Sequence, residues 1–286
     1  MSEQPRLLYH YTSIDAFRSI VDSGKMRATR FDQMNDESEL QIGLKRLLEA
    51  VNGYQVGPHE VEFKQRLLEL IDKSIVEPKE VYVACFSAAK DSLEQWRAYT
   101  PQGGVAIGFD LQKVGEGFLC DITRRVSGQP IGNPTTPDLN NRLSACRYTD
   151  RTGYLNLSRT VAERFFKADS YPALLMSQHQ LAVEIGIAAL IADIYGTICS
   201  IKHGAYVHEE EWRSVNYNPN SQDYPVRLSE RGKWYIEFPF NPKDYIREVW
   251  ISPHGDTQAI ERVISYFKIN NELPFDVQKS TIPFRL

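Results

Sequence analysis

A long apolar segment in the second half of the chain sets the strongest limit on its fold. The segment spans residues 181–201, LAVEIGIAALIADIYGTICSI. Glu184 and Asp193 interrupt it, and the uncharged run between them has 8 residues, whereas a membrane-spanning helix needs about 20. A helix that is apolar on nearly every side is buried in a protein core. The segment therefore predicts a central helix of a helical subdomain and no membrane span.

The order of the remaining segments predicts an α+β fold. Strand and helix signals come first, strands such as EVYVACFS and GGVAIGFD follow, helical patterns fill the next part, and strands return near the end. This order fits α+β with a helical insertion better than repeated βαβ units. We expect a single domain over residues 1–286, with the insertion at about 154–203. Residues 127–141 are rich in turn-forming residues and predict a surface loop or mobile flap.

The first helix can be delimited from its end signals. Residues 14–23, IDAFRSIVDS, follow the apolar and aromatic strand LLYHY. Ser13 is a good N-cap, because its hydroxyl can accept a hydrogen bond from a free N–H of the first turn. Gly24 suits the left-handed position that ends a helix.

Charge and cysteine content exclude several classes of protein. Lys and Arg number 33 against 37 Asp and Glu, a net charge of −4, so no global basic field attracts nucleic acid or an anionic membrane. The four cysteines are widely spaced and form no CxxC pair, which indicates reduced thiols rather than disulfides or zinc. The first residues contain no apolar signal-peptide core, and we expect a cytoplasmic protein.

The stretch HEEEWRSV, residues 208–215, places three carboxylates in a row at the start of an apolar and aromatic segment. We expect a strand over AYVHEEEWRSVNY, in which alternate side chains share a face. Glu209 and Glu211 would then point the same way, with Arg213 as their charge partner, and Trp212 would lie in the core. The alternative is an exposed strand edge whose charges discourage aggregation.

Other chemistries fit this sequence less well. HEEEW lacks the second histidine of the zinc motif HExxH, and the spacing of His203, His208 and Glu211 matches no metal template, so no metal site is expected. Cys85 and His10 could imitate a Cys–His nucleophile, but a cysteine inside VYVACFS is typical of a packed core.

Four more positions carry two interpretations each. Arg27, with Arg30 nearby, could bind a pyrophosphate or could be a solvated surface residue. Tyr99, on one helix with Trp96, could stack on a ligand or pack in the core. The pair Asn35-Asp36 could belong to a substrate loop or cap a helix.

Six short motifs taken together resemble a large family of uncharacterised bacterial domains. They span nearly the whole chain and follow the order HYT, NDxxE, CFS, WxxY, ExEWR and SxIPFR. Here they are His10–Thr12, Asn35–Glu39, Cys85–Ser87, Trp96–Tyr99, Glu209–Arg213 and Ser280–Arg285. A strand of the form GxxIGF, here GVAIGF, accompanies them.

The same pattern is similar, more distantly, to the ADP-ribosyltransferase superfamily of the H-Y-E type. The sequence departs from that pattern at Tyr11, where many members of the superfamily have glycine. This resemblance implies a split sheet with a helical insertion and NAD as the substrate. It implies that Glu211 is the catalytic carboxylate and Glu209 its assistant. The residues that it implies for binding NAD are His10, Thr12, Ser87 and Tyr99, to which the pyrophosphate interpretation adds Arg27.

The chemistry gives these residue types a physical reason. Cleavage of the bond between nicotinamide and ribose develops positive charge on the sugar, which a nearby carboxylate stabilises. A second carboxylate can deprotonate the attacking group. The acceptor would be a protein, a nucleic acid or water, and bacterial relatives of this kind act as toxins or in phage defence. The rival hypothesis is a non-catalytic module on the same fold that senses a nucleotide or binds a protein.

Overall fold

The computed structural model describes residues 6–34, 38–76, 81–110, 143–149, 162–163, 165–166, 179–217 and 224–283. Several predictions fall outside these ranges. They concern the loop at 127–141, Asn35 and Asp36, Arg285, and most of the expected insertion before residue 179.

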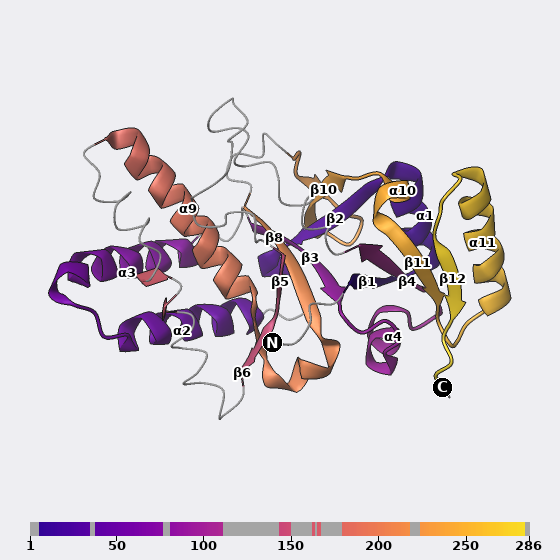
Figure 1. Cartoon of the computed structure of the whole chain (residues 1–286), viewed down its shortest axis with the longest axis horizontal. Helices are drawn as coiled ribbons and strands as arrows, with labels where there is room; N and C mark the ends of the chain where they lie inside the picture. Colours follow the sequence, from indigo (N-terminus) through magenta and orange to yellow (C-terminus); the bar gives the residue numbers. More distant parts are fainter. Residues whose placement is uncertain are drawn as a thin grey trace.

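The described part of the chain is a mixed α/β protein, in which helices flank a large sheet (Figure 1). Its helices are α1 (Ile14–Ser23), α2 (Ser38–Gly53), α3 (Val61–Val76), α4 (Leu93–Tyr99), α9 (Gln180–Cys199), α10 (Pro242–Tyr245) and α11 (Thr257–Asn270), with 3-10 turns η1 (Phe31–Gln33), η2 (Pro58–Glu60) and η4 (Gly204–Glu209). Its strands are β1 (Leu7–Thr12), β2 (Lys25–Arg30), β3 (Val81–Ser87), β4 (Val105–Asp110), β5 (Leu143–Ala145), β6 (Arg147–Thr149), β7 (Ile201–His203), β8 (Glu211–Tyr217), β9 (Arg227–Leu228), β10 (Trp234–Pro239), β11 (Ile246–Ile251) and β12 (Asp276–Lys279).

The main sheet has ten strands and is mixed. Its principal order is β12-β11-β4-β1-β3-β2-β10-β9, and β8 pairs with β3 and carries β5 on its other edge. The β11–β12 pair is parallel, and the other pairs of this sheet are antiparallel. A separate parallel pair joins β6 to β7.

The sheet divides where β1 and β2 meet the same edge of β3. Strand β8 pairs with β3 along its full length, from Val81 to Ser87. On the opposite edge, β1 pairs only at Ser87, whereas β2 pairs only at Tyr82 and Val83. Between these contacts, residues 84–86 of β3 have no strand partner on that edge among the described residues. The two halves of the sheet therefore diverge from one short junction and leave a wedge between β1 and β2.

The local signals around α1 are confirmed. The hydroxyl of Ser13 accepts a hydrogen bond from the backbone N–H of Ala16 at 3.2 Å. Gly24 adopts the left-handed conformation (φ 58°, ψ 37°) and donates its N–H to the carbonyl of Ile20. The buried side of α1 consists of Phe17, Ile20 and Val21.

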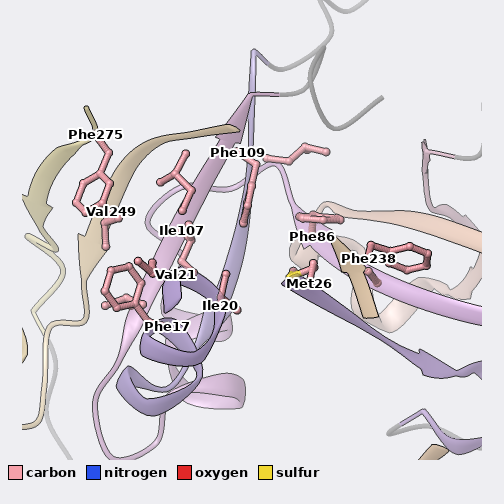
Figure 2. Packing of buried hydrophobic residues seen from close by; sticks show 14 of the residues in the cluster. Phe17, Ile20, Val21, Met26, Phe86, Ile107, Phe109, Phe238, Val249 and Phe275 are labelled. Carbon is pink, nitrogen blue, oxygen red and sulfur yellow. The ribbon is translucent and has the colours of Figure 1, made fainter. Parts of the chain in front are cut away.

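These three side chains belong to the larger of the described cores. Figure 2 shows them beside the strands that carry Ile107 and Val249. Aromatic rings from several strands and loops complete this core, including Phe86, Phe109, Phe238 and Phe275. Burial of so many rings anchors β3, which carries the wedge, and β4, which pairs with β1.

The apolar segment at 181–201 forms most of α9 and ends at the start of β7, so the predicted helix is present. Helix α9 does not form its core alone, because Leu190, Ile194 and Ile198 pack with buried residues of α2 and α3. These three helices lie together at one end of the molecule, opposite α11 (Figure 1). Within the described ranges, no helix is both long and apolar enough to cross a membrane.

Close contact between α2 and α9 depends on a glycine. A Cβ atom added to Gly43 would lie 2.5 Å from the backbone carbonyl oxygen of Ile198, which is too close for any side chain. We expect Gly43→Ala to lower the free energy of unfolding by about 1–3 kcal/mol, because the two helices must move apart. The measurement is urea unfolding followed by circular dichroism.

Gly53 provides the matched control in the same helix, because an added Cβ there meets nothing within 4 Å. Gly53→Ala should leave the stability unchanged or raise it slightly, since alanine favours the helix. Equal losses in the two variants would contradict close packing at Gly43.

Candidate functional site

The wedge between β1 and β2 opens into two adjoining hollows. The larger has a volume of about 280 Å³, and its wall includes Arg27, Glu39, Lys202 and Arg213. The smaller has a volume of about 50 Å³ and is mostly aromatic, with Tyr9, Tyr11 and Phe86 in its wall. Both hollows share His10, Cys85, Tyr99, Glu209 and Glu211. A charged compartment therefore meets an aromatic one at the two glutamates.

His10 lies in the wedge and has a defined tautomer. Its Nδ1 atom lies 3.0 Å from the carbonyl oxygen of Cys85, on the unpaired edge of β3. Since a carbonyl oxygen only accepts hydrogen bonds, Nδ1 carries the proton. Burial lowers the pKa of His10, so the ring is neutral near pH 7. Its Nε2 atom therefore keeps a lone pair that can accept a hydrogen bond from a hydroxyl group.

Glu211 is a buried anion at the back of the hollow. It is 5% exposed, and its Oε1 atom accepts a hydrogen bond from Nε of Arg213 at 2.7 Å. Its Oε2 atom lies 2.5 Å from Nζ of Lys202. Burial alone would raise the pKa of Glu211, but these two cations lower it to about 2. Glu211 is therefore ionised at any pH at which the protein would normally work.

Glu209 has a different environment, although Lys202 also contacts it at 2.5 Å. It is only half-buried, and burial raises its pKa despite the lysine. Two carboxylates at one site thus have pKa values displaced in opposite directions. This divergence is typical of acid–base sites, in which one group stays charged and the other exchanges a proton.

Arg213 connects the hollow to the helices. It is 1% exposed, and its Nη2 atom donates to Glu39 of α2 at 2.6 Å. Its Nη1 atom donates to the carbonyl of Cys199, the last residue of α9. With Lys202 and the glutamates at 209 and 211, these residues form a charge cluster of three carboxylates and two cations. When all three carboxylates are ionised they outnumber the two cations of the cluster by one, and Arg27 and Lys233 also line the larger hollow.

The proposed site residues divide into two groups by position. His10, Tyr99, Arg27, Glu209 and Glu211 all line the larger hollow.

Thr12 and Ser87 line neither hollow. Thr12 ends β1 opposite Val105. Ser87 is buried, and its hydroxyl donates to the backbone carbonyl of Glu209 at 2.7 Å, so it supports the turn that carries Glu209.

The expected strand over residues 205–217 is wrong in its first half. Residues 204–209 form η4, Glu210 is left-handed at φ 43°, and β8 begins at Glu211. The reason is that the chain must reverse between β7 and β8, and a 3-10 turn does so in few residues. The two glutamates share the hollow because both bind Lys202, not because they alternate on one strand.

Two residues of the charge cluster were missed in the sequence. Lys202 is the first charged residue after the apolar stretch of α9, and a lysine directly after such a stretch could have indicated a buried cation. Glu39 closes the NDxxE motif and is 4% exposed, whereas glutamate is seldom fully buried without a partner. Glu39 is buried because it pairs with Arg213, 174 residues later, whereas Lys202 contacts two glutamates only 7 and 9 residues later in addition to Glu39.

Cys85 is not an activated nucleophile in this structure. Burial raises the pKa of its thiol, and Glu211 adds to this effect. The thiol therefore stays protonated, and its weak nucleophilicity agrees with a packing role.

Residues 95–214 match a family described as "Protein of unknown function (DUF2971)". The matched part carries Tyr99, Lys202, Glu209, Glu211 and Arg213, whereas His10 and Glu39 precede it. No curated protein and no solved structure matches the chain.

Proposed function

We propose that the hollow binds NAD and that the protein cleaves the bond between nicotinamide and ribose, as an ADP-ribosyltransferase-like enzyme or an NAD glycohydrolase. One observation carries this proposal: His10 and Glu211, about 200 residues apart in the chain, line the same hollow. The resemblance of the motifs to the H-Y-E superfamily assigns the same two positions to NAD.

The size of the hollow suits the reacting half of the dinucleotide. Ligand sites commonly enclose about 300–1,000 Å³, and the larger hollow, at about 280 Å³, is near the lower end. The nicotinamide ring would occupy the aromatic compartment beside Tyr99, and the ribose would lie at the two glutamates. The pyrophosphate would leave the hollow toward Arg27, whose side chain is more than half exposed and lies 3.3 Å from Glu237.

The reaction balances with the groups present. The bond from C1′ of ribose to the nicotinamide nitrogen breaks, and its electron pair leaves with neutral nicotinamide. The carboxylate of Glu211, as the fixed anion, stabilises the cation that forms on the sugar. An oxygen of water or of an acceptor then bonds to C1′ and gives its proton to Glu209. His10 accepts a hydrogen bond from a ribose hydroxyl through Nε2.

The acceptor of the ADP-ribose is a protein, a nucleic acid or water. The resemblance to bacterial transferases favours a role as a toxin or as a phage-defence effector, in the cytoplasm.

A second candidate function has an observation in its favour. Both carboxylate oxygens of Glu211 are already engaged by cations, as in a purely structural ion cluster. A non-catalytic module that senses a nucleotide or binds a protein would need no free carboxylate. The Oε2 atom also accepts a hydrogen bond from Nη2 of Arg213 at 3.2 Å, so both of its lone pairs are used. The Oε1 atom has a second lone pair, so Glu211 can accept a hydrogen bond from a ribose hydroxyl that displaces the weak thiol donor of Cys85.

The two functions are separated by incubating the full chain with NAD and measuring free nicotinamide by chromatography. The enzyme predicts nicotinamide release that grows with time and with protein concentration. The nucleotide-sensing module predicts saturable binding of NAD, measured by calorimetry, with no nicotinamide released. If the protein neither binds NAD nor releases nicotinamide from it, the assignment of the hollow to NAD is wrong.

A further inference from the structure

Lys202 is the hub of the charge cluster. It is 5% exposed and comes from β7, directly behind the two glutamates. Its ammonium lies 2.5 Å from Glu209 and from Glu211, and 3.5 Å from Glu39. An ammonium group has three N–H donors, and here it faces three carboxylates from three different elements.

The charge on Lys202 is maintained by these neighbours. Burial would lower its pKa, but Glu211 and Glu209 outweigh this effect and raise the pKa above its usual value. The lysine is therefore a permanent cation, which excludes it as a base or a nucleophile. Its remaining influence is on where the carboxylates lie and on how strongly they hold protons.

We propose that Lys202 is a positioning residue that keeps Glu211 a fixed anion and holds Glu209 beside it as the group that exchanges a proton. The inference rests on the proposed function, because it assigns a task within the same site. The geometry supports it: Glu209 sits on a 3-10 turn rather than on the sheet, and its carboxylate is held at the hollow by Lys202.

The other ionisable groups around this pair come from every neighbouring element. Arg213 forms ion pairs with Glu211 and Glu39. Lys202 is therefore the one cation in the described cluster that contacts Glu209. The remaining groups that face the pair or line the same hollow are His10 on β1, Arg27 on β2, Cys85 on β3, Tyr99 on α4, Cys146, Tyr148 on β6, Tyr206 on η4 and Lys233.

Removal of the lysine charge should therefore act mainly on Glu209. In Lys202→Met we expect the acidic limb of the pH profile for nicotinamide release to move up by about one pH unit, because an opposite charge has been lost. We also expect kcat to fall at least about 10-fold with a smaller change in KM, as when one group that acts in the transition state is impaired. Lys202→Arg, which keeps the charge, should restore the position of the acidic limb.

A second readout does not depend on catalysis. The carboxyl carbons of ¹³C-labelled glutamate can be titrated by NMR, with the Glu209 signal assigned from Glu209→Gln. Its titration should move to higher pH in Lys202→Met by about the same unit. Lys243→Met is the matched control, because it removes a lysine from an exposed pair with Glu272 and should leave the Glu209 titration unchanged.

The outcomes are distinguishable. An unshifted Glu209 titration in Lys202→Met, or an arginine variant that behaves like the methionine variant, would overturn the role of Lys202. If the wild-type protein releases no nicotinamide, the proposed function fails, but the NMR titration still tests the lysine. If Lys202→Met does not fold, the double variant Lys202→Met with Glu39→Gln removes one charge of each sign, and the same shift is expected in it.

Discussion

Glu211→Gln is expected to slow nicotinamide release from NAD by about 10²–10³-fold, the usual loss when one preorganised charge is removed from a transition state. The amide has almost the same shape but no negative charge to place beside the cationic sugar. Because Glu211 is ionised throughout the accessible pH range, the loss should be similar at every pH. Initial rates at saturating NAD measure it.

The adjacent residue offers a closely matched control. Glu210 is exposed and lines neither hollow. Glu210→Gln should keep the rate within about twofold, as for other surface substitutions. Thermal unfolding of each variant separates lost chemistry from lost structure. Equal rates for wild type and Glu211→Gln, with both folded, would remove Glu211 from the reaction and favour the non-catalytic module.

Arg213→Met is expected to lower the free energy of unfolding by about 3–5 kcal/mol, because it leaves buried carboxylates without their partner. Arg213 holds Glu39 and Glu211 while it is itself 1% exposed. Chemical denaturation at pH 7 measures the loss. Arg227→Met, which removes an exposed arginine 3.5 Å from Glu237, should cost no more than about 1 kcal/mol.

The loss in Arg213→Met should also depend on pH. In the wild type, the folded-state pKa of Glu211 is about 2, below its usual value, so its ionisation stabilises the fold above about pH 4.5. That contribution disappears as pH falls from about 4.5 toward 2. Without Arg213 the pKa is less depressed, so the stability gap between variant and wild type should narrow over this range. A gap that is constant with pH would mean that lost packing, rather than lost charge pairing, dominates.

Short-range features of the fold could be predicted from the sequence. The capping residues of α1, the strands at β1, β3 and β4, and the buried helix α9 each follow from signals within a few residues. The shared hollow of His10 and Glu211 was also expected, but through the resemblance of motifs rather than through any local pattern.

The missed features depend on how the chain folds back on itself rather than on local propensity. No local pattern shows that Glu39, on an amphipathic helix, pairs with an arginine 174 positions later. The alternation expected from EEEWR failed at Glu209, because the need to reverse direction between β7 and β8 outweighs strand propensity there. Lys202 was missed although Glu209 and Glu211 lie only 7 and 9 residues after it, because no local pattern shows that the chain turns back there or that Glu39 joins them.

The wedge on the edge of β3 gives the molecule a particular mechanical property. One residue pair, Tyr9 with Ser87, is the only strand-to-strand rung that the described residues provide between the half containing β1 and the half containing β3. Any occupant of the wedge touches both sides of this narrow bridge. Ligand binding in the wedge is therefore expected to stiffen the whole sheet. Slower amide hydrogen exchange at residues 84–86 after addition of the ligand would report binding even when no reaction takes place.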